Sequence, residues 1–200
     1  SSKSSLDPFK EEKSEDIERL KNIQLDLHKD FIIAGAEGIT INSYAITPHR
    51  LRQFNLEDEF KSLQLKACDA ATQARDELDT DVKILGCLPP LIGSYHTTAG
   101  ITKQDSKDVY QRMIDIQAPH VDWFIAETVT SISEAEIIVE VAQESNVKLW
   151  LSYSVSDDDG KWLRSGEPLH RGLKHFENSN LDIITIPPTG TISLNAFACE

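Results

Sequence analysis

Hydrophobic and polar positions along the chain alternate between a helical and a strand-like spacing. Over about residues 15–35, Ile17, Leu20, Leu27 and Phe31 fall on one stripe of a helix. Short apolar runs typical of strands follow, with helical spacing between them. The strands are expected at residues 38–44, 82–87, 121–128, 147–154 and 181–186, and the helices at about 58–78, 103–117, 132–145 and 167–177.

This alternation of helix and strand predicts an α/β fold with a parallel sheet covered on both faces. No GxGxxG phosphate loop follows any of the strands, which favours a (β/α)8 TIM barrel over a dinucleotide-binding sheet. About six strands are readable in the series, and one barrel strand is missing ahead of residue 15, where the chain is too polar to form it.

A (β/α)8 barrel typically takes about 250 residues, whereas the chain has 200. We therefore expect an incomplete barrel, either because the chain is a fragment or because internal residues are missing from it. Residues 1–14 are interpreted as a polar N-terminal segment or loop remnant, and residues 15–200 as a single barrel domain with an incomplete C-terminal part.

Composition narrows the range of partners and compartments. A net charge of −13 opposes binding to nucleic acid and to anionic membranes. No run of about 18 apolar residues and no N-terminal signal peptide is visible, so no membrane span is expected. Cys68, Cys87 and Cys199 form neither a CxxC pair nor an even framework, which is typical of reduced thiols in a cytoplasmic protein.

One strand ends in an isolated carboxylate. The apolar run from Phe124 closes with Glu127 and Thr128, and a helix is predicted to open at Ser131. In an α/β fold, a residue at the C-terminal edge of a parallel strand faces the ligand crevice. Glu127 is therefore the leading candidate for a site residue. The alternative is a structural role, in which its carboxylate accepts backbone amides at the start of the next helix.

Four motifs in the same order resemble the homocysteine S-methyltransferases, a family of zinc-dependent (β/α)8 barrels. They are residues 30–44, which end in Thr-Ile-Asn-Ser-Tyr, the loop Gly-Cys-Leu-Pro-Pro-Leu-Ile-Gly-Ser-Tyr at 86–95, the Phe-Ile-Ala-Glu-Thr segment with its helix at 124–136, and residues 150–154 with 163–169. The similarity runs from about residue 25 to residue 186.

The resemblance implies roles for residues that match the motifs. Glu127 aligns with the glutamate that holds the amino group of homocysteine, and Thr128 follows it in the same motif. Asn42 and Tyr44 are expected on the same rim, where an amide and a phenol could orient the substrate. An asparagine at a strand end is also a common turn former.

The loop after the 82–87 strand resembles an active-site wall in the family. Pro89 and Pro90 stiffen its start because each proline fixes its own φ angle. Pro89 and Tyr95 are accordingly placed among the substrate-binding candidates. The alternative is an ordinary packed connection between a strand and a helix.

The metal site of the family has no visible counterpart. The family binds zinc through a cysteine after the sixth strand and a cysteine pair near the C-terminus, whereas this chain has Ile-Thr-Ile-Pro-Pro at 184–188 and Cys199 alone. If the chain is complete, it should not bind catalytic zinc. If residues are missing near position 187, a zinc ligand could be among them, and we favour this explanation.

The resemblance implies an enzyme that moves a methyl group from a sulfonium or ammonium donor to the thiol of homocysteine, giving methionine. Its small-molecule partners would be homocysteine and a methyl donor, and a homo-oligomer is possible for such a barrel. The donor is left open among betaine, S-methylmethionine and S-adenosylmethionine, and no catalytic residue is assigned. The rival hypothesis is a non-catalytic barrel that lost zinc and serves a binding or assembly role.

Overall fold

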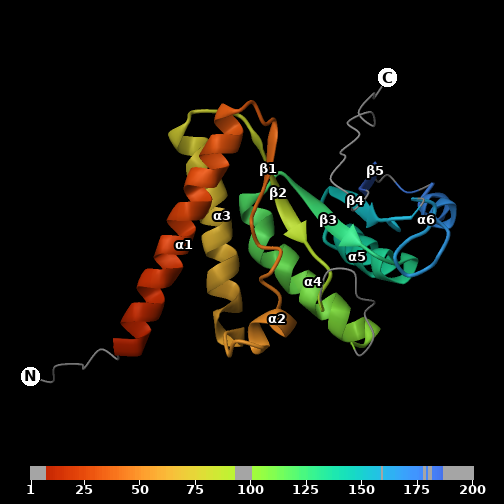
Figure 1. The fold of residues 1–200 in the computed structure, drawn as a ribbon, viewed down its shortest axis with the longest axis horizontal. Helices are drawn as coiled ribbons and strands as arrows, with labels where there is room; N and C mark the ends of the chain where they lie inside the picture. The colour runs from red at the N-terminus through yellow and green to blue at the C-terminus, as the bar shows by residue number, and fades with distance from the viewer. Residues whose placement is uncertain (1–7, 93–100, 159, 178, 180–181, 187–200) are drawn as a thin grey trace, which may run out of the picture.

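The computed structural model describes residues 8–92, 101–158, 160–177, 179 and 182–186 (Figure 1). Its helices and strands occur close to the positions that the hydrophobic pattern predicts. In chain order they are α1 (Pro8–Ile33), β1 (Gly38–Thr40), α2 (Pro48–Arg52), the 3-10 turn η1 (Glu57–Glu59), α3 (Phe60–Glu77), β2 (Lys83–Leu88), α4 (Lys103–Gln117), the 3-10 turn η2 (Ala118–His120), β3 (Trp123–Val129), α5 (Ile132–Glu144), β4 (Leu149–Ser154), α6 (Leu169–His175) and β5 (Asp182–Ile186).

All five strands are parallel, and their order in the sheet is the order along the chain, β1-β2-β3-β4-β5. A doubly wound sheet would reverse this order at a switch point, whereas consecutive barrel strands follow one another in this way. The predicted parallel α/β fold is therefore confirmed, and the described strands form an open five-stranded sheet.

The N-terminal part differs from the sequence pattern in one respect. The described residues contain five strands, and the described part of the stretch ahead of residue 15 holds none, as its polarity predicts. The polar stretch is helical from Pro8 onward. Lysine and glutamate are good helix formers, and proline is well tolerated in the first helical turn, so the run extends α1 toward the N-terminus.

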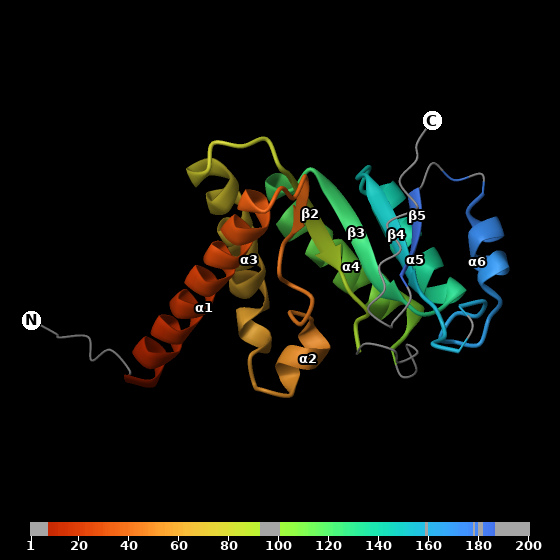
Figure 2. The ribbon, with the colours of Figure 1, turned by 45° about the horizontal axis from the view of Figure 1, so that its top comes forward.

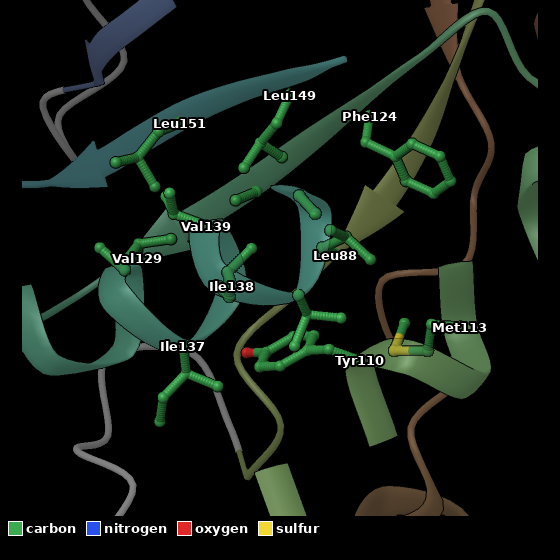
Figure 3. Packing of buried hydrophobic residues seen from close by; sticks show 14 of the residues in the cluster. Leu88, Tyr110, Met113, Phe124, Val129, Ile137, Ile138, Val139, Leu149 and Leu151 are labelled. Atoms are coloured by element: carbon green, nitrogen blue, oxygen red, sulfur yellow. The ribbon is translucent and has the colours of Figure 1, made fainter. Parts of the chain in front are cut away.

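The main core lies between one face of the sheet and the helices α4 and α5. Phe124 and Leu149 project from the sheet and pack with Tyr110, Met113 and Ile138 of the two helices, all of them buried (Figure 3). Gly172 of α6 approaches the buried Tyr153 on the same face. The helices thus cover one face, so the prediction of a sheet covered on both faces was wrong for the described residues. Successive right-handed crossovers without a reversal of strand order place the helices on the same face.

The opposite face of the sheet would be the interior of a barrel. Trp123 and Trp150 pack there with ring centroids 5.1 Å apart, and Ile125 and Glu127 continue the same face along β3 because side chains alternate along a strand. All four side chains are only partly buried. This face carries the candidate site.

Helix α1 lies beside α3 at the β1 end of the sheet (Figures 1 and 2). Leu25 packs against Ala70 and Ala74 of α3, and an ion pair joins Lys29 to Glu77. Within the described ranges, neither this 26-residue helix nor any other is long and apolar enough to cross a membrane.

Gly86 provides the first test of this packing. A Cβ atom at this position would lie 2.6 Å from the Phe124 ring and 2.7 Å from Oε1 of Gln117. Because both neighbours are buried, we expect Gly86→Ala to lower the free energy of unfolding by about 1–3 kcal/mol in chemical denaturation. Gly38→Ala is the control, since its Cβ would meet the end of the Leu85 side chain at 3.1 Å and Lys83 O at an ordinary 3.7 Å. Equal losses in the two variants would contradict the packing described here.

Candidate functional site

The site begins where β1 separates from β2. The last rung between them is the hydrogen bond from Ile41 N to Leu85 O, 2.9 Å long. The chain then turns sharply, with Ser43 N donating to Ile41 O at 2.8 Å. In a parallel pair, alternate residues bond to the same neighbour, so the backbone of Cys87 faces the space that β1 has left.

A buried glutamine fills this open rung. The Cys87 N–H donates to Oε1 of Gln117 at 2.9 Å, and Nε2 of Gln117 donates to Cys87 O at 3.1 Å. Nε2 of Gln117 also donates to Oε1 of Gln64 at 2.9 Å, and Gln64 in turn donates to Ile46 O at 2.8 Å. Two fully buried amides therefore tie the loop after β1 to strand β2.

Further contacts fix the other end of this loop. The buried hydroxyl of Thr47 donates to Leu91 O at 3.0 Å and caps α2 by accepting from Arg50 N. Arg50 donates from Nη1 to Tyr44 O at 3.1 Å, and its Cζ lies 4.8 Å from the centroid of the Tyr44 ring. Tyr44 is therefore held by α2, and the loop that follows it is tied to α3.

Strand β3 is irregular at the point where Glu127 occurs. Its register with β4 shifts between Ala126 and Val129, as in a β-bulge. Within the shift, Thr128 has a φ of 60°. A β-branched residue rarely adopts this left-handed conformation, and such strain is concentrated at functional sites. The irregularity marks the Glu127–Thr128 pair as the special point of the strand.

Glu127 shares a cavity of about 430 Å³ with the loop after β1. The cavity follows the outer edge of β1, and its walls come from α1, β1, β3 and this loop. It is lined by Leu27, His28, Phe31, Ala36, Gly38, Ile39, Thr40, Ile41, Asn42, Tyr44 and Glu127. Glu127 therefore lines one cavity together with Asn42 and Tyr44, which precede it by 85 and 83 residues in the sequence.

Burial controls the electrostatics of this cavity. Desolvation raises the pKa of the Glu127 carboxyl, and a hydrogen bond from the Cys87 thiol opposes that rise. Desolvation also raises the pKa of Cys87 well above its usual value, and the neighbouring carboxylate adds to this shift. Cys87 is therefore a protonated thiol beside Glu127, and it is buried, as the sequence predicted.

The start of α5 is served by other carboxylates. Glu134 accepts from Thr130 N at 3.1 Å and donates its own N–H to Ser131 Oγ at 3.2 Å. Glu167, from the loop before α6, accepts from Ile132 N at 3.1 Å. The helix-start role that was the alternative for Glu127 is thus filled by Glu134 and Glu167.

The remaining predicted residues lie apart from the cavity lining. Pro89 is buried, and its carbonyl accepts from the Tyr110 hydroxyl at 3.2 Å, which is the packed-loop arrangement. Thr128 adjoins Glu127 but does not line the cavity. Tyr95 lies outside the described residues.

Sequence reasoning missed His28, Gln117 and Arg50. His28 is buried on α1, where burial lowers the pKa of its imidazole, and it lines the cavity. A histidine or glutamine inside a helix has no local pattern that distinguishes a buried bridging role from a solvated one. The one sequence signal for the burial of His28 is its position next to Leu27, on the apolar stripe of α1.

The described residues do not form a zinc site. Over the ranges given above, no group of three or more His, Cys, Asp or Glu side chains is arranged to hold a metal ion. Cys68 and Cys87 are free and buried in one apolar cluster. Cys199 lies outside the described ranges.

Comparison with known sequences gives a consistent family assignment. Residues 7–190 match the family model described as Homocysteine S-methyltransferase. Homocysteine S-methyltransferase 2 of Arabidopsis thaliana is 28% identical over 179 residues, which cover 76% of this chain and 54% of the plant protein. Homocysteine S-methyltransferase 1 of Brassica oleracea var. italica is 27% identical over 177 residues, covering 77% and 54%. The chain thus spans about half the length of the curated relatives it matches.

Solved structures show the same fold. The metallated form of the homocysteine methyltransferase MmuM from Escherichia coli matches with a TM-score of 0.69 at 21% identity, over 80% of this chain and 61% of that structure. Its oxidized form matches with a TM-score of 0.73 at 19% identity, over 85% and 64%. At these identities the likeness supports the fold alone.

The hydrogen bonds between the side-chain amide of Gln117 and the backbone of Cys87, here called the amide bridge, can be tested through stability. Gln117→Leu keeps the volume but leaves the N–H and C=O of Cys87 buried without partners, so we expect the free energy of unfolding to fall by about 2–4 kcal/mol. Chemical denaturation measures the loss. Gln104→Leu on the same helix is the control, because its amide bonds only to the exposed Asp108, and it should change stability by less than about 0.5 kcal/mol. A small loss for Gln117→Leu would show that the bridge does not hold the strand.

Proposed function

The chain belongs to the homocysteine S-methyltransferase family, and we propose that it contributes to the transfer of a methyl group to the sulfur of homocysteine, giving methionine. The single observation that carries the proposal is the cavity in which Glu127, Asn42 and Tyr44 meet. A carboxylate, an amide and a phenol around one partly dry space fit the polar end of an amino acid.

Glu127 would bind the ammonium group of homocysteine. A carboxylate surrounded by apolar walls gains from a cationic partner, because the charge-assisted hydrogen bond replaces the water that burial has removed. The neutral thiol of Cys87 lies near the carboxylate and does not compete for its charge. Asn42 and Tyr44, which line the same cavity, would orient the bound amino acid.

The chemistry is a displacement at carbon. The sulfur of homocysteine, as thiolate, forms a bond to the methyl carbon of an onium donor, and the bond from that carbon to the donor sulfur or nitrogen breaks. The electron pair of the broken bond stays on the donor, which leaves as a neutral thioether or amine. The described residues would contribute to this step by binding and orienting the acceptor.

The described residues do not fit a catalytic zinc ion. Zinc remains a proposal drawn from the family, in which it would lower the pKa of the bound thiol. The rival function is a non-catalytic barrel that binds a partner. A cytosolic location is proposed from the free thiols of Cys68 and Cys87.

Replacing Glu127 tests the acceptor site. In an assay with homocysteine and each of the three donors, Glu127→Gln should raise the KM for homocysteine about 10- to 100-fold, because it removes the negative partner of the ammonium. Glu136→Gln is the control, since Glu136 pairs with His175 at the surface of α5. An unchanged KM would exclude Glu127 from substrate binding.

The pH dependence follows from the raised pKa of Glu127. As pH rises through this pKa, the carboxylate forms and the KM for homocysteine should fall, whereas Glu127→Gln should lack this limb of the profile. Any stability that protonated Glu127 contributes is present below its unfolded pKa and lost as pH rises through the folded value. Glu127→Gln should therefore unfold at the same or a higher temperature than the parent protein at neutral pH.

Metal analysis separates the enzyme from its rival. The enzyme hypothesis predicts about one zinc per protein molecule in elemental mass spectrometry of a preparation made without chelators, together with methyl transfer that a strong chelator abolishes. Protein without zinc and without turnover would support the binding role.

A further inference from the structure

A second cavity lies on the other side of the loop that carries Asn42 and Tyr44. Its volume is about 420 Å³, within the usual range for sites of small molecules. Ala45, Ile46, Leu51, Phe54 and Ile92 supply apolar lining, and Arg50 supplies a cation. Successive residues of one loop therefore line two different cavities.

Arg50 differs from the two other partly buried arginines of the chain. Arg75 and Arg164 each lie within 4.0 Å of a carboxylate. For Arg50, no carboxylate among the described residues lies within that distance, although the side chain is partly buried. Its recorded partners are the Tyr44 carbonyl and the Tyr44 ring. A guanidinium has five N–H donors, and these contacts leave most of them for a ligand.

Tyr44 and Arg50 contact one another, and each lines a different one of the two cavities. Tyr44 lines the cavity of Glu127, and Arg50 lines the second one. Methyl transfer needs two substrates whose reacting atoms meet while their polar ends are held apart. The two cavities offer a negative group to one substrate and a positive group to the other.

We propose that the second cavity binds the methyl donor, with Arg50 pairing with a carboxylate of a small zwitterionic onium compound. This inference rests on the proposed methyl transfer and specifies where the donor would bind. The aliphatic part of the donor would lie against Leu51, Phe54 and Ile92. Arginine suits the role because its planar fork can bond both oxygens of a carboxylate.

The test compares donors with and without the carboxylate. Betaine and S-methylmethionine are each titrated against their carboxamides by calorimetry, with the parent protein and with Arg50→Met. The parent should bind the acids about 10- to 100-fold more tightly than the carboxamides. Arg50→Met should lose this preference. Because the preference is a ratio within one protein sample, a partly unfolded variant does not distort it.

Two further variants sharpen the result. Arg52→Met, on the same helix but paired with Glu57, should keep the preference for the acids. Arg50→Lys should keep part of it, because a single ammonium retains the charge but not the fork. In turnover assays, Arg50→Met should raise the KM for the donor about 10- to 100-fold and leave the KM for homocysteine within about 3-fold.

Each outcome separates the two proposals. An acid preference that survives Arg50→Met would overturn the donor site, even if methyl transfer is observed. A rise in the KM for homocysteine in place of the donor would assign Arg50 to the acceptor carboxylate and also overturn it. Acid preference that depends on Arg50, without turnover from any donor, would keep the binding site and remove the proposed function.

Discussion

The early departure of the chain from β2 is the constraint on which the rest of the site depends. Once β1 turns away after Ile41, the backbone of Cys87 has no strand to pair with, and an unpaired buried N–H and C=O would be costly. The side-chain amide of Gln117 carries the same donor and acceptor as a peptide group, so it replaces the missing rung. Gly86 permits this, because a side chain there would occupy the position of the amide. The loop after β1 is thereby free to form cavity walls instead of continuing the strand.

The same region concentrates groups that are unfavourable for stability. Thr128 has a backbone conformation that disfavours β-branched residues, and the Glu127 carboxyl and Cys87 thiol are both desolvated. None of these features improves the packing of the main core, which lies on the other face of the sheet. Strain and desolvation at one strand end, held in place by a well-packed helical layer, are typical of a binding site prepared before its ligand arrives.

The sequence predicts those parts of the molecule that rest on periodicity. Strand β3 and helix α5 are identified because an apolar run and a 3.6-residue pattern are local properties, and Glu127 is identified because it ends such a run. The role of Gln117 is different, since its importance comes from Cys87 and Gln64, which are 30 and 53 residues away. The bulge at Thr128 likewise depends on the pairing of β3 with β4. Residues whose role is to replace or interrupt regular hydrogen bonding leave no periodic signal.

The pKa of Glu127 bears on how the two cavities relate. An arginine in contact with a carboxylate stabilises its charged form and lowers its pKa, whereas the pKa of Glu127 is raised and Arg50 is not among the groups that shift it. The two charges are therefore not paired with one another, although both belong to the walls formed by a single short loop. Had they formed an ion pair, each would have satisfied the other and neither would attract a zwitterion. The Tyr44 ring lies against Arg50, and in the proposed scheme this separation would leave one cation and one anion for two different substrates.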